Sequence, residues 1–285
     1  MPYNLLGARR SHTIFATLAL TLMVPSSQML LADETADSAE ELQVSKDKFH
    51  IYLLIGQSNM AGRGKMSAKD RLPTPNVFTL DSNNQWKAAS HPLHFDKPNI
   101  AGVGLGLDFA IAMLASDPDI KIGLVPSAVG GTSLKQWSKG GEFYEAALTR
   151  TKIAEKQGTL KGILWHQGES DSGAGSASTY AERLAQLIAD LRGDLDEPAL
   201  PFVLGELGDF RVGVKRRSDI VIEQQQSIPS LVPHTACVSA KGLGHKGDGT
   251  HFGAKSLREF GKRYAKAMTA LQTPADEKAG TDQIP

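Results

Sequence analysis

The stretch "HIYLLIGQSNMAGRG", from His50 to Gly64, joins a run of apolar residues to a small polar turn. The run is too continuous for a half-exposed antiparallel strand and is typical of a parallel strand that helices cover on both faces. It stops at Gly56, a residue that permits a tight turn, and Ser58 follows just past the strand end. Parallel sheets bind ligands beyond the carboxyl ends of their strands, so Ser58 is a candidate for chemistry.

Further apolar runs repeat this pattern along the chain, and amphipathic stretches separate them. Strands that alternate with helices predict a three-layer α/β/α sandwich with a central parallel sheet, of the flavodoxin-like kind. Gly193 is the expected C-cap of the third of these helices. The expected strands are Phe49–Gly56, Ile120–Pro126, Lys161–Gly168, Pro201–Leu207 and Thr235–Ala240, and the expected helices are Gly104–Ala115, Glu142–Lys156, Ser178–Arg192, Arg217–Ser227 and Ala254–Ala270.

The composition excludes some classes of partner. The chain has 285 residues, of which 41% are hydrophobic, and its 31 Lys and Arg balance its 31 Asp and Glu. The net charge therefore gives no indication of binding to nucleic acid or to an anionic membrane. Cys237 is the sole cysteine, so no intrachain disulfide can form, and its apolar neighbours predict a buried, unreactive thiol.

The N-terminus has the features of a secretory signal. Arg9 and Arg10 precede the short apolar run Ile14–Val24, and Ala32 supplies a small residue for cleavage. A buried N-terminal helix and an uncleaved anchor are the alternatives. We expect export to the periplasm or medium, with no stable membrane association after cleavage. The expected organisation is a signal peptide over 1–32, a flexible leader over 33–47, one domain over 48–272 and a flexible tail over 273–285.

Four polar segments follow strands of the predicted sheet and are expected to meet at one of its edges. They are the turn at Ser58, "SAVGGTS" (127–133), "WHQGESD" (165–171) and "GDGTHFG" (247–253). Ester hydrolysis needs a hydroxyl nucleophile, a base, a carboxylate that orients the base, and donors for the oxyanion. Ser58 can supply the hydroxyl, and His251 and Asp248 in the last segment can supply the base and its carboxylate.

Each of these segments also has a simpler interpretation. Ser58 can be a helix cap, the "GG" pair can merely allow a turn, and "DGTHFG" can cap the last helix. Two rival sites are a metal site and another nucleophile. His245, Asp248 and His251 carry ligands suited to zinc or manganese, and Ser170 or Ser172 lies in a segment that half-resembles a nucleophile elbow.

The motifs "GQSNMAG", "GGTSLKQW", "WHQGESD" and "DGTHF", in this order, resemble the SGNH hydrolase superfamily. They are most similar to its sialate O-acetylesterase and acetylxylan esterase branch, carbohydrate esterase family six, and the similarity covers about 49–270. The resemblance implies a three-layer α/β/α fold. It also implies that no metal or other cofactor takes part in removing acetyl groups from sugar hydroxyls.

The same resemblance assigns roles to individual residues. Ser58 matches the nucleophile, His251 the base and Asp248 the carboxylate that orients the base, although Glu169 is a second candidate for that carboxylate. The matching oxyanion donors are the Ser58 and Gly130 amides, with Gly131 as the alternative glycine. Gln167 stands where the superfamily usually has an asparagine donor.

An acetylated carbohydrate is therefore the expected substrate, and an inactive carbohydrate-binding protein or a lipase- or thioesterase-like enzyme are the alternatives. Trp86, Trp137 and Trp165 are candidate sugar platforms, although core packing is the simpler role for each. Arg63 and His166 are candidate substrate contacts because they lie near the motifs in sequence. The residues favour no particular sugar and no oligomeric state.

Overall fold

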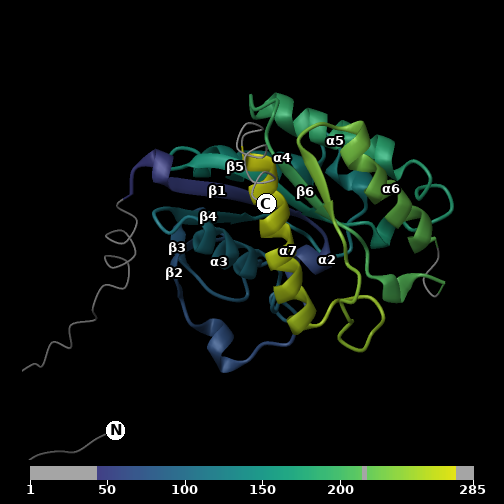
Figure 1. The fold of residues 1–285 in the computed structure, drawn as a ribbon, viewed down its shortest axis with the longest axis horizontal. Coiled ribbons are helices and arrows are strands. Elements are labelled where there is room, and N and C mark those ends of the chain that lie inside the picture. The colour runs from purple at the N-terminus through teal and green to yellow at the C-terminus, as the bar shows by residue number, and fades with distance from the viewer. Residues whose placement is uncertain (1–43, 214–216, 274–285) are drawn as a thin grey trace, which may run out of the picture.

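A seven-stranded sheet runs through the centre of the molecule (Figure 1). The structure, a computed structural model, describes residues 44–213 and 217–273. The spatial order of the strands is β3-β2-β4-β1-β5-β6-β7. Their bounds are β1 Phe49–Gly56, β2 Thr74–Leu80, β3 Trp86–Ala89, β4 Lys121–Pro126, β5 Thr159–His166, β6 Phe202–Gly205 and β7 Thr235–Val238.

The five strands predicted from apolar runs are confirmed, and they pair in parallel around β1. β2 and β3 were not predicted. β2 pairs in parallel with β4, whereas β3 pairs antiparallel with β2 and forms one edge of the sheet. β2 opens with exposed or half-exposed residues that include a proline, and β3 is only four residues long with a single fully buried member. Neither strand therefore has the long apolar run that marks the central strands.

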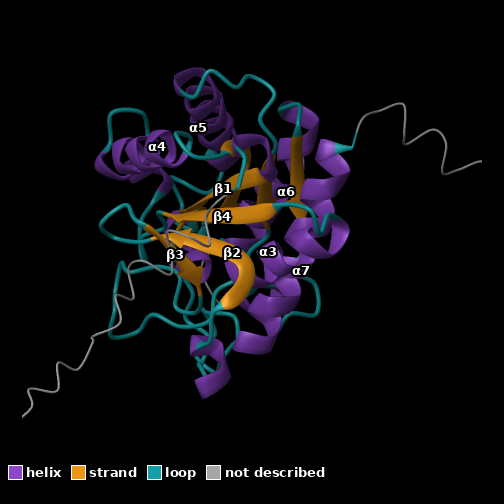
Figure 2. Cartoon of the chain, turned by 90° about the vertical axis from the view of Figure 1, so that its left-hand side faces the viewer, coloured by secondary structure: helices purple, strands orange, loops and turns teal. Residues whose placement is uncertain are grey.

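Helices cover both faces of the sheet and complete three layers (Figure 2). The short helix α2 follows β1 directly, and each of the five predicted helices is confirmed within a few residues. The bounds are α2 Ser58–Ala61, α3 Gly106–Ser116, α4 Glu142–Ala154, α5 Tyr180–Asp194, α6 Ser218–Leu231 and α7 Ala254–Gln272. Short 3-10 helices occupy Lys46–Lys48, Ala68–Arg71, Leu134–Trp137, Glu169–Asp171 and Asp209–Arg211.

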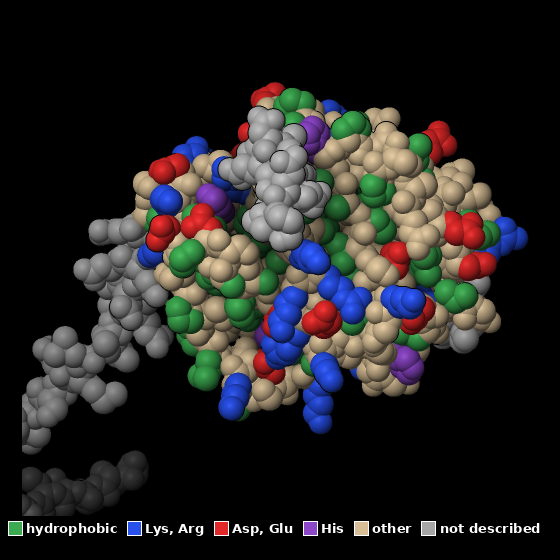
Figure 3. Space-filling view, in the orientation of Figure 1, with side chains coloured by type: hydrophobic (Ala, Val, Ile, Leu, Met, Phe, Trp, Pro, Cys, Tyr) green, Lys and Arg blue, Asp and Glu red, His purple; other side chains and the backbone are tan. Residues whose placement is uncertain are grey.

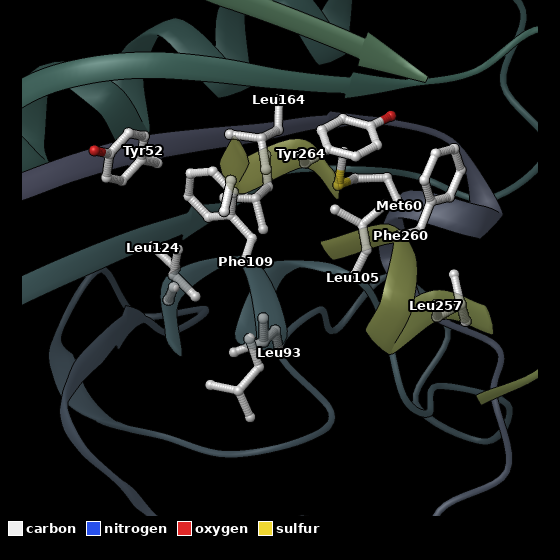
Figure 4. Packing of buried hydrophobic residues seen from close by; sticks show 14 of the residues in the cluster. Tyr52, Met60, Leu93, Leu105, Phe109, Leu124, Leu164, Leu257, Phe260 and Tyr264 are labelled. Carbon is white, nitrogen blue, oxygen red and sulfur yellow. The ribbon is translucent and has the colours of Figure 1, made fainter. Parts of the chain in front are cut away.

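The alternation of side chains along β1 divides the core between the two faces. Tyr52 and Leu54 pack with α3 and α7 residues such as Phe109 (Figure 4). Ile51 and Leu53 lie in the other cluster, with residues from α4, α5 and α6. Every residue of β1 but one is fully buried, which is the environment that its apolar sequence predicts.

Gly193 does not end its helix as expected. α5 runs through Gly193 to Asp194, and a Cβ added at Gly193 would meet no atom within 4 Å. The apolar stripe of the helix extends to Leu191, and Leu195 takes the C-cap position. The packed face of α5, rather than a glycine signal, sets where this helix stops.

The balanced net charge conceals a local grouping of cations. Lys and Arg side chains gather over α7 on the face that Figure 3 shows. This helix carries the exposed Lys255, Lys262 and Lys266. Within the part of the chain that the structure describes, no helix is long and apolar enough to cross a membrane. The predicted signal peptide over 1–32 lies outside the described residues.

Candidate active site

The carboxyl ends of β1, β4 and β5 lie side by side at one edge of the sheet. Gly56 pairs with His166, and Leu54 pairs with Pro126, so the three strands end at nearly the same level. The polar segments that follow them, at Ser58, 127–133 and 167–171, therefore start next to one another. This is the convergence that the sequence predicts.

Gly56 makes the sharp turn after β1 possible. Its φ is 126°, and a Cβ at this position would lie 2.2 Å from the backbone oxygen of His166. The next amide, Gln57 N–H, donates to the same oxygen at 2.8 Å. Only glycine fits this close approach of two backbones, and the turn fixes Ser58 as the first residue of α2 with 6% of its surface exposed.

Ser58, His251 and Asp248 form a continuous hydrogen-bonded chain. The Ser58 Oγ lies 3.0 Å from His251 Nε2, and His251 Nδ1 lies 2.7 Å from Asp248 Oδ2. Ser58 comes from the end of β1, whereas the other two come from the loop before α7, 190 or more residues away in sequence. The order hydroxyl, imidazole, carboxylate is the arrangement that activates a serine for attack on an ester.

The electrostatics of Asp248 suit a carboxylate that must stay ionised. Burial raises its pKa, but the His251 and Thr250 amides and the His251 ring outweigh this effect and hold the pKa well below its usual range. The two amides donate to Oδ1 at 2.8 and 2.9 Å. Oδ2 stays with the imidazole, so the carboxylate fixes which ring nitrogen faces Ser58.

Glu169, the other candidate carboxylate, does not contact His251. Its Oε1 accepts from Asn59 Nδ2 at 2.5 Å, and that same amide nitrogen donates to the Thr250 oxygen at 3.2 Å. Asn59 Oδ1 in turn accepts from the Phe252 amide at 3.0 Å. Asn59 therefore ties Glu169 to both residues that flank His251.

Gly130 lies beside Ser58, as expected of an oxyanion donor, but its amide already has an acceptor. A Cβ at Gly130 would be 3.5 Å from Ser58 Cβ. The Gly130 N–H donates to Asp96 Oδ2 at 2.8 Å, and Asp96 pairs with Arg63 at 2.6 Å, with both side chains at most 3% exposed. Burial raises the pKa of Asp96, but Arg63 and the Gly130 amide together lower it below its usual value.

The expected role of Gln167 as an oxyanion donor does not agree with its hydrogen bonds. Gln167 Nε2 donates to the Thr132 oxygen at 3.0 Å and to Asp171 Oδ2 at 2.7 Å. These two bonds use both amide hydrogens, and the side chain is fully buried. Gln167 thus holds the 130–134 turn against the segment after β5 instead of presenting a free donor.

The rival sites have structural roles. His245 Nδ1 accepts from the Gly247 and Gly249 amides at 2.9 and 3.2 Å, which closes the loop that carries His251. Ser172 Oγ donates to the Gly168 oxygen at 3.0 Å. Within the described residues, the Ser170 hydroxyl makes no hydrogen bond to a histidine, whereas the Ser58 hydroxyl does. Among residues 44–213 and 217–273, no group of three or more His, Cys, Asp or Glu is arranged to hold a metal ion.

The candidate sugar contacts are mostly core residues. Trp137 and Trp165 are 1% and 0% exposed and pack edge to face at 5.7 Å. Trp86 packs on Phe49 at 4.9 Å. His166 is fully buried between the rings of α7 and the His251 loop, and burial lowers its pKa. The interpretation of Trp137, Trp165 and His166 as substrate contacts is therefore wrong.

Two residues of this site escaped the sequence reasoning. Asn59 stands directly after Ser58 in the motif, and its place beside the nucleophile was a usable signal. Asp96 carried no such signal, because its segment has no motif and follows the unpredicted strand β3.

Cys237, expected to be buried, is half-buried, and burial together with Glu206 raises the pKa of its thiol to about 12.

A three-layer sandwich of this topology, with a serine turn after the first strand, is the fold of the SGNH hydrolases. Residues 48–270 match the model of a family described as carbohydrate esterase, sialic acid-specific acetylesterase. The chain belongs to this family. It is a carboxylic ester hydrolase that acts on carbohydrates.

Individual relatives agree with this assignment. A probable carbohydrate esterase of Arabidopsis thaliana is 33% identical over 249 residues, which span 80% of this chain and 93% of that protein. The X-ray structure of an Arabidopsis thaliana protein superimposes with a TM-score of 0.71 at 33% identity, covering 78% of this chain and 98% of that one. The crystal structure of NanS shares the fold, with a TM-score of 0.67 at 17% identity and coverage of 80% and 99%.

Proposed function

We propose that this protein is an exported serine esterase that removes O-acetyl groups from carbohydrates through Ser58, His251 and Asp248. The observation that carries the proposal is the hydrogen-bonded chain from Ser58 Oγ through the His251 ring to Asp248. The 3.0 Å distance puts the Ser58 hydroxyl within proton-transfer reach of its base, and the 2.7 Å distance puts that base within hydrogen-bond reach of its carboxylate.

The first half-reaction acylates the serine. His251 Nε2 takes the proton of Ser58 Oγ as the oxygen attacks the acetyl carbonyl carbon, and the carbonyl oxygen becomes an oxyanion. The intermediate collapses when the C–O bond to the sugar breaks, and the imidazolium returns its proton to the departing sugar oxygen. The sugar leaves with a free hydroxyl, and the acetyl group stays on Ser58.

The second half-reaction uses water in place of the sugar. His251 removes a proton from water, the hydroxide attacks the acetyl-serine, and collapse releases acetate and restores the Ser58 hydroxyl. Asp248 keeps the imidazole oriented and offsets the charge that it gains in each half. No metal takes part in any step.

The Ser58 amide and the Gly130 amide are the proposed donors to the oxyanion. The Gly130 N–H donates to Asp96 in the free protein, so the carbonyl oxygen must replace Asp96 Oδ2 as the acceptor. The Gly130 amide then donates to the anionic oxygen of the intermediate instead of to the anionic oxygen of Asp96. Asp96 keeps its ion pair with Arg63. Loss of one oxyanion donor typically costs on the order of 10²–10³ in turnover.

Export is proposed from the sequence of the N-terminus alone. Two arginines, a short apolar run and a small residue at Ala32 are the three parts of a signal peptide. N-terminal sequencing of protein recovered from the medium or periplasm of a producing cell tests this. We expect a mature chain that begins near residue 33, and an intact Met1 on membrane-bound protein would contradict it.

Hydrolysis of p-nitrophenyl acetate by the wild type and by Ser58→Ala tests the mechanism. We expect Ser58→Ala to lower kcat/KM by at least about 10³-fold with an unchanged unfolding transition. Ser170→Ala is the matched control and should retain wild-type activity. EDTA should leave the wild type unaffected, and a strong loss with EDTA or an active Ser58→Ala would contradict the proposal.

Chain length of the acyl group separates this enzyme from a lipase. p-Nitrophenyl acetate and p-nitrophenyl octanoate share a leaving group and differ only in the acyl part. An acetylesterase should prefer the acetyl ester, whereas faster turnover of the octanoyl ester would identify a lipase-like enzyme.

A further inference from the structure

A hollow of about 490 Å³ lies at the β3 edge of the sheet, apart from the Ser58 triad. The turn between β2 and β3 forms one wall, and the segment 90–101 after β3 forms the other. None of Ser58, Asp248 and His251 lines it. Its lining includes charged side chains and an aromatic ring, which is the composition of a small-molecule site rather than of a packing defect.

The charges in this hollow favour an anion. Arg71 and Lys87 line it, and both are exposed. Neither makes an ion pair or a side-chain hydrogen bond with any residue of the described ranges. Asp81 is the one carboxylate in the lining, and its Oδ1 already accepts from the Asn83 and Gln85 amides at 2.8 and 3.0 Å. Within the described residues, the unpaired cations Arg71 and Lys87 thus outnumber the one carboxylate of the lining, Asp81, which already accepts hydrogen bonds from the turn.

Phe95 gives the hollow a rigid flat wall. It is 41% exposed, although a large apolar side chain usually lies inside. The Arg150 guanidinium lies 5.0 Å from its ring centroid and is itself fixed by the Leu80 and Asp81 oxygens and by Asn84. An exposed ring held from one side in this way offers its free surface to the apolar face of a sugar ring.

The hollow is connected to the active site through consecutive residues. Asp96, directly after Phe95, accepts the Gly130 amide, and Lys97 Nζ donates to the Gly130 oxygen at 3.0 Å. In the sheet, β4 alone separates β2 from β1. Strands are spaced roughly 5 Å apart, so the β3 edge lies three spacings, or about 15 Å, from β1. One oligosaccharide can reach both.

We propose that this hollow is a subsite for a carboxylate-bearing sugar of the same glycan whose acetyl group is bound at Ser58. Arg71 and Lys87 bind the carboxylate, and Phe95 stacks on the ring. The inference rests on the proposed esterase function and names its substrate class as O-acetylated acidic oligosaccharides.

The test compares two substrates of equal length, an O-acetylated oligogalacturonide and an O-acetylated xylo-oligosaccharide, with p-nitrophenyl acetate as the small ester. The variants are Phe95→Ala and the double variant Arg71→Ala/Lys87→Ala. We expect KM for the acidic substrate to rise about tenfold in the double variant, as the loss of a charged hydrogen bond implies. Activity on p-nitrophenyl acetate should stay within about twofold of wild type, because these residues do not touch the triad.

Matched controls remove the same groups elsewhere. Lys152→Ala/Lys266→Ala deletes two exposed cations outside the hollow, and Ile111→Ala truncates another exposed apolar side chain that is 45% exposed. Neither should change KM for the acidic substrate. An equal loss on p-nitrophenyl acetate in the subsite variants, or an equal KM for acidic and neutral substrates in the wild type, would overturn the subsite.

Calorimetry that measures binding of the deacetylated oligogalacturonide tests the subsite independently of the proposed esterase activity. If the wild type hydrolyses none of the three esters, the esterase proposal fails, yet the ligand should still bind and binding should weaken in the double variant. If the wild type hydrolyses the esters but does not bind this ligand, the esterase stands and the subsite falls.

Discussion

The two loops that meet at the active site are built in opposite ways. The nucleophile turn after β1 is buried throughout residues 51–64, and backbone contacts fix it to β5. The loop from 244 to 253 is largely exposed, and the side chains of His251 and Asp248 are 24% and 37% exposed. One buried anchor, Phe252, holds this loop against the rings of His166, Phe210 and Phe260.

This difference separates the residues that place the site from those that perform the chemistry. A change in the buried turn must disturb the sheet, whereas a change at the tip of the exposed loop can alter the reaction and leave the fold intact. Asn59 belongs to the buried turn but bonds to the exposed loop, so it should show both kinds of effect.

Among changes that keep both Ser58 and His251, Asp248→Asn should have the largest effect on activity. The amide removes the negative charge beside His251 and permits the wrong ring tautomer, so we expect kcat to fall by about 10²–10⁴-fold. Steady-state kinetics on p-nitrophenyl acetate measure this, and circular dichroism should show an unchanged fold. A loss below tenfold would mean that Asp248 does not orient the base.

The loss of stability in Asp248→Asn, relative to wild type, should become smaller as pH falls. Because the pKa of Asp248 is lowered in the folded state, its ionised form stabilises the protein above the pKa of about 3.9 of an unfolded aspartate. That contribution is lost as pH falls through the lowered pKa. The Tm difference between wild type and Asp248→Asn should therefore be present at neutral pH and shrink below about pH 4.

Gly56→Ala should have the largest effect on stability. Its Cβ would overlap the His166 backbone oxygen, and the strained φ adds to the cost, so we expect unfolding to become easier by at least about 3 kcal/mol. Gly140→Ala is the matched control, since Gly140 also has a positive φ but no atom within 4 Å of the added Cβ. It should cost only about 1–2 kcal/mol. Equal costs in urea denaturation would show that the close approach at Gly56 is unimportant.

Asn59→Ala should lower both the stability and the activity of the protein by intermediate amounts. It leaves the Phe252 amide and Glu169 without their partner, which costs about 1–3 kcal/mol of stability. The released loop displaces His251, and we expect kcat to fall about 10- to 100-fold. Asn99→Ala, at an exposed position, should change neither. Full activity in folded Asn59→Ala would remove Asn59 from the support of His251.

Gly193→Ala should have the smallest effect and the opposite sign. Gly193 lies inside α5 with open space around it, and alanine is the better helix former. We expect stability to rise by about 0.5–1 kcal/mol and activity to stay unchanged. Thermal unfolding measures the gain, and a loss of stability would show that Gly193 ends the helix after all.

The central part of the fold could be predicted because its signal is local. Strands buried on both faces are continuous apolar runs, and the helices between them carry apolar stripes, so both are legible without knowledge of the tertiary structure. β3 forms the edge of the sheet and β2 lies next to it, and in both strands part of the chain faces solvent and the apolar run is interrupted. The pairing of β2 with β4 and of β3 with β2, rather than their own sequence, makes them strands.

In the site, too, some residues could be predicted from the sequence and others could not. Ser58, Asp248 and His251 could be proposed together because strand ends converge and because the carboxylate and the imidazole are three residues apart. The partners of Gly130 and Gln167 could not be foreseen. Asp96 reaches Gly130 from another segment, and Gln167 bonds both to Asp171 in its own segment and to the Thr132 oxygen in a distant one. Side-chain hydrogen bonds of this kind leave no periodic pattern in a sequence.

Covalent labelling tests the central claim most directly. A fluorophosphonate reacts with a serine only where a neighbouring base activates it, and mass spectrometry of the digested protein locates the adduct. We predict one adduct, on Ser58, in the folded wild type, with none in His251→Ala. An adduct on Ser170 or Ser172, or no adduct in a preparation that hydrolyses acetyl esters, would contradict the assignment of Ser58 as the nucleophile.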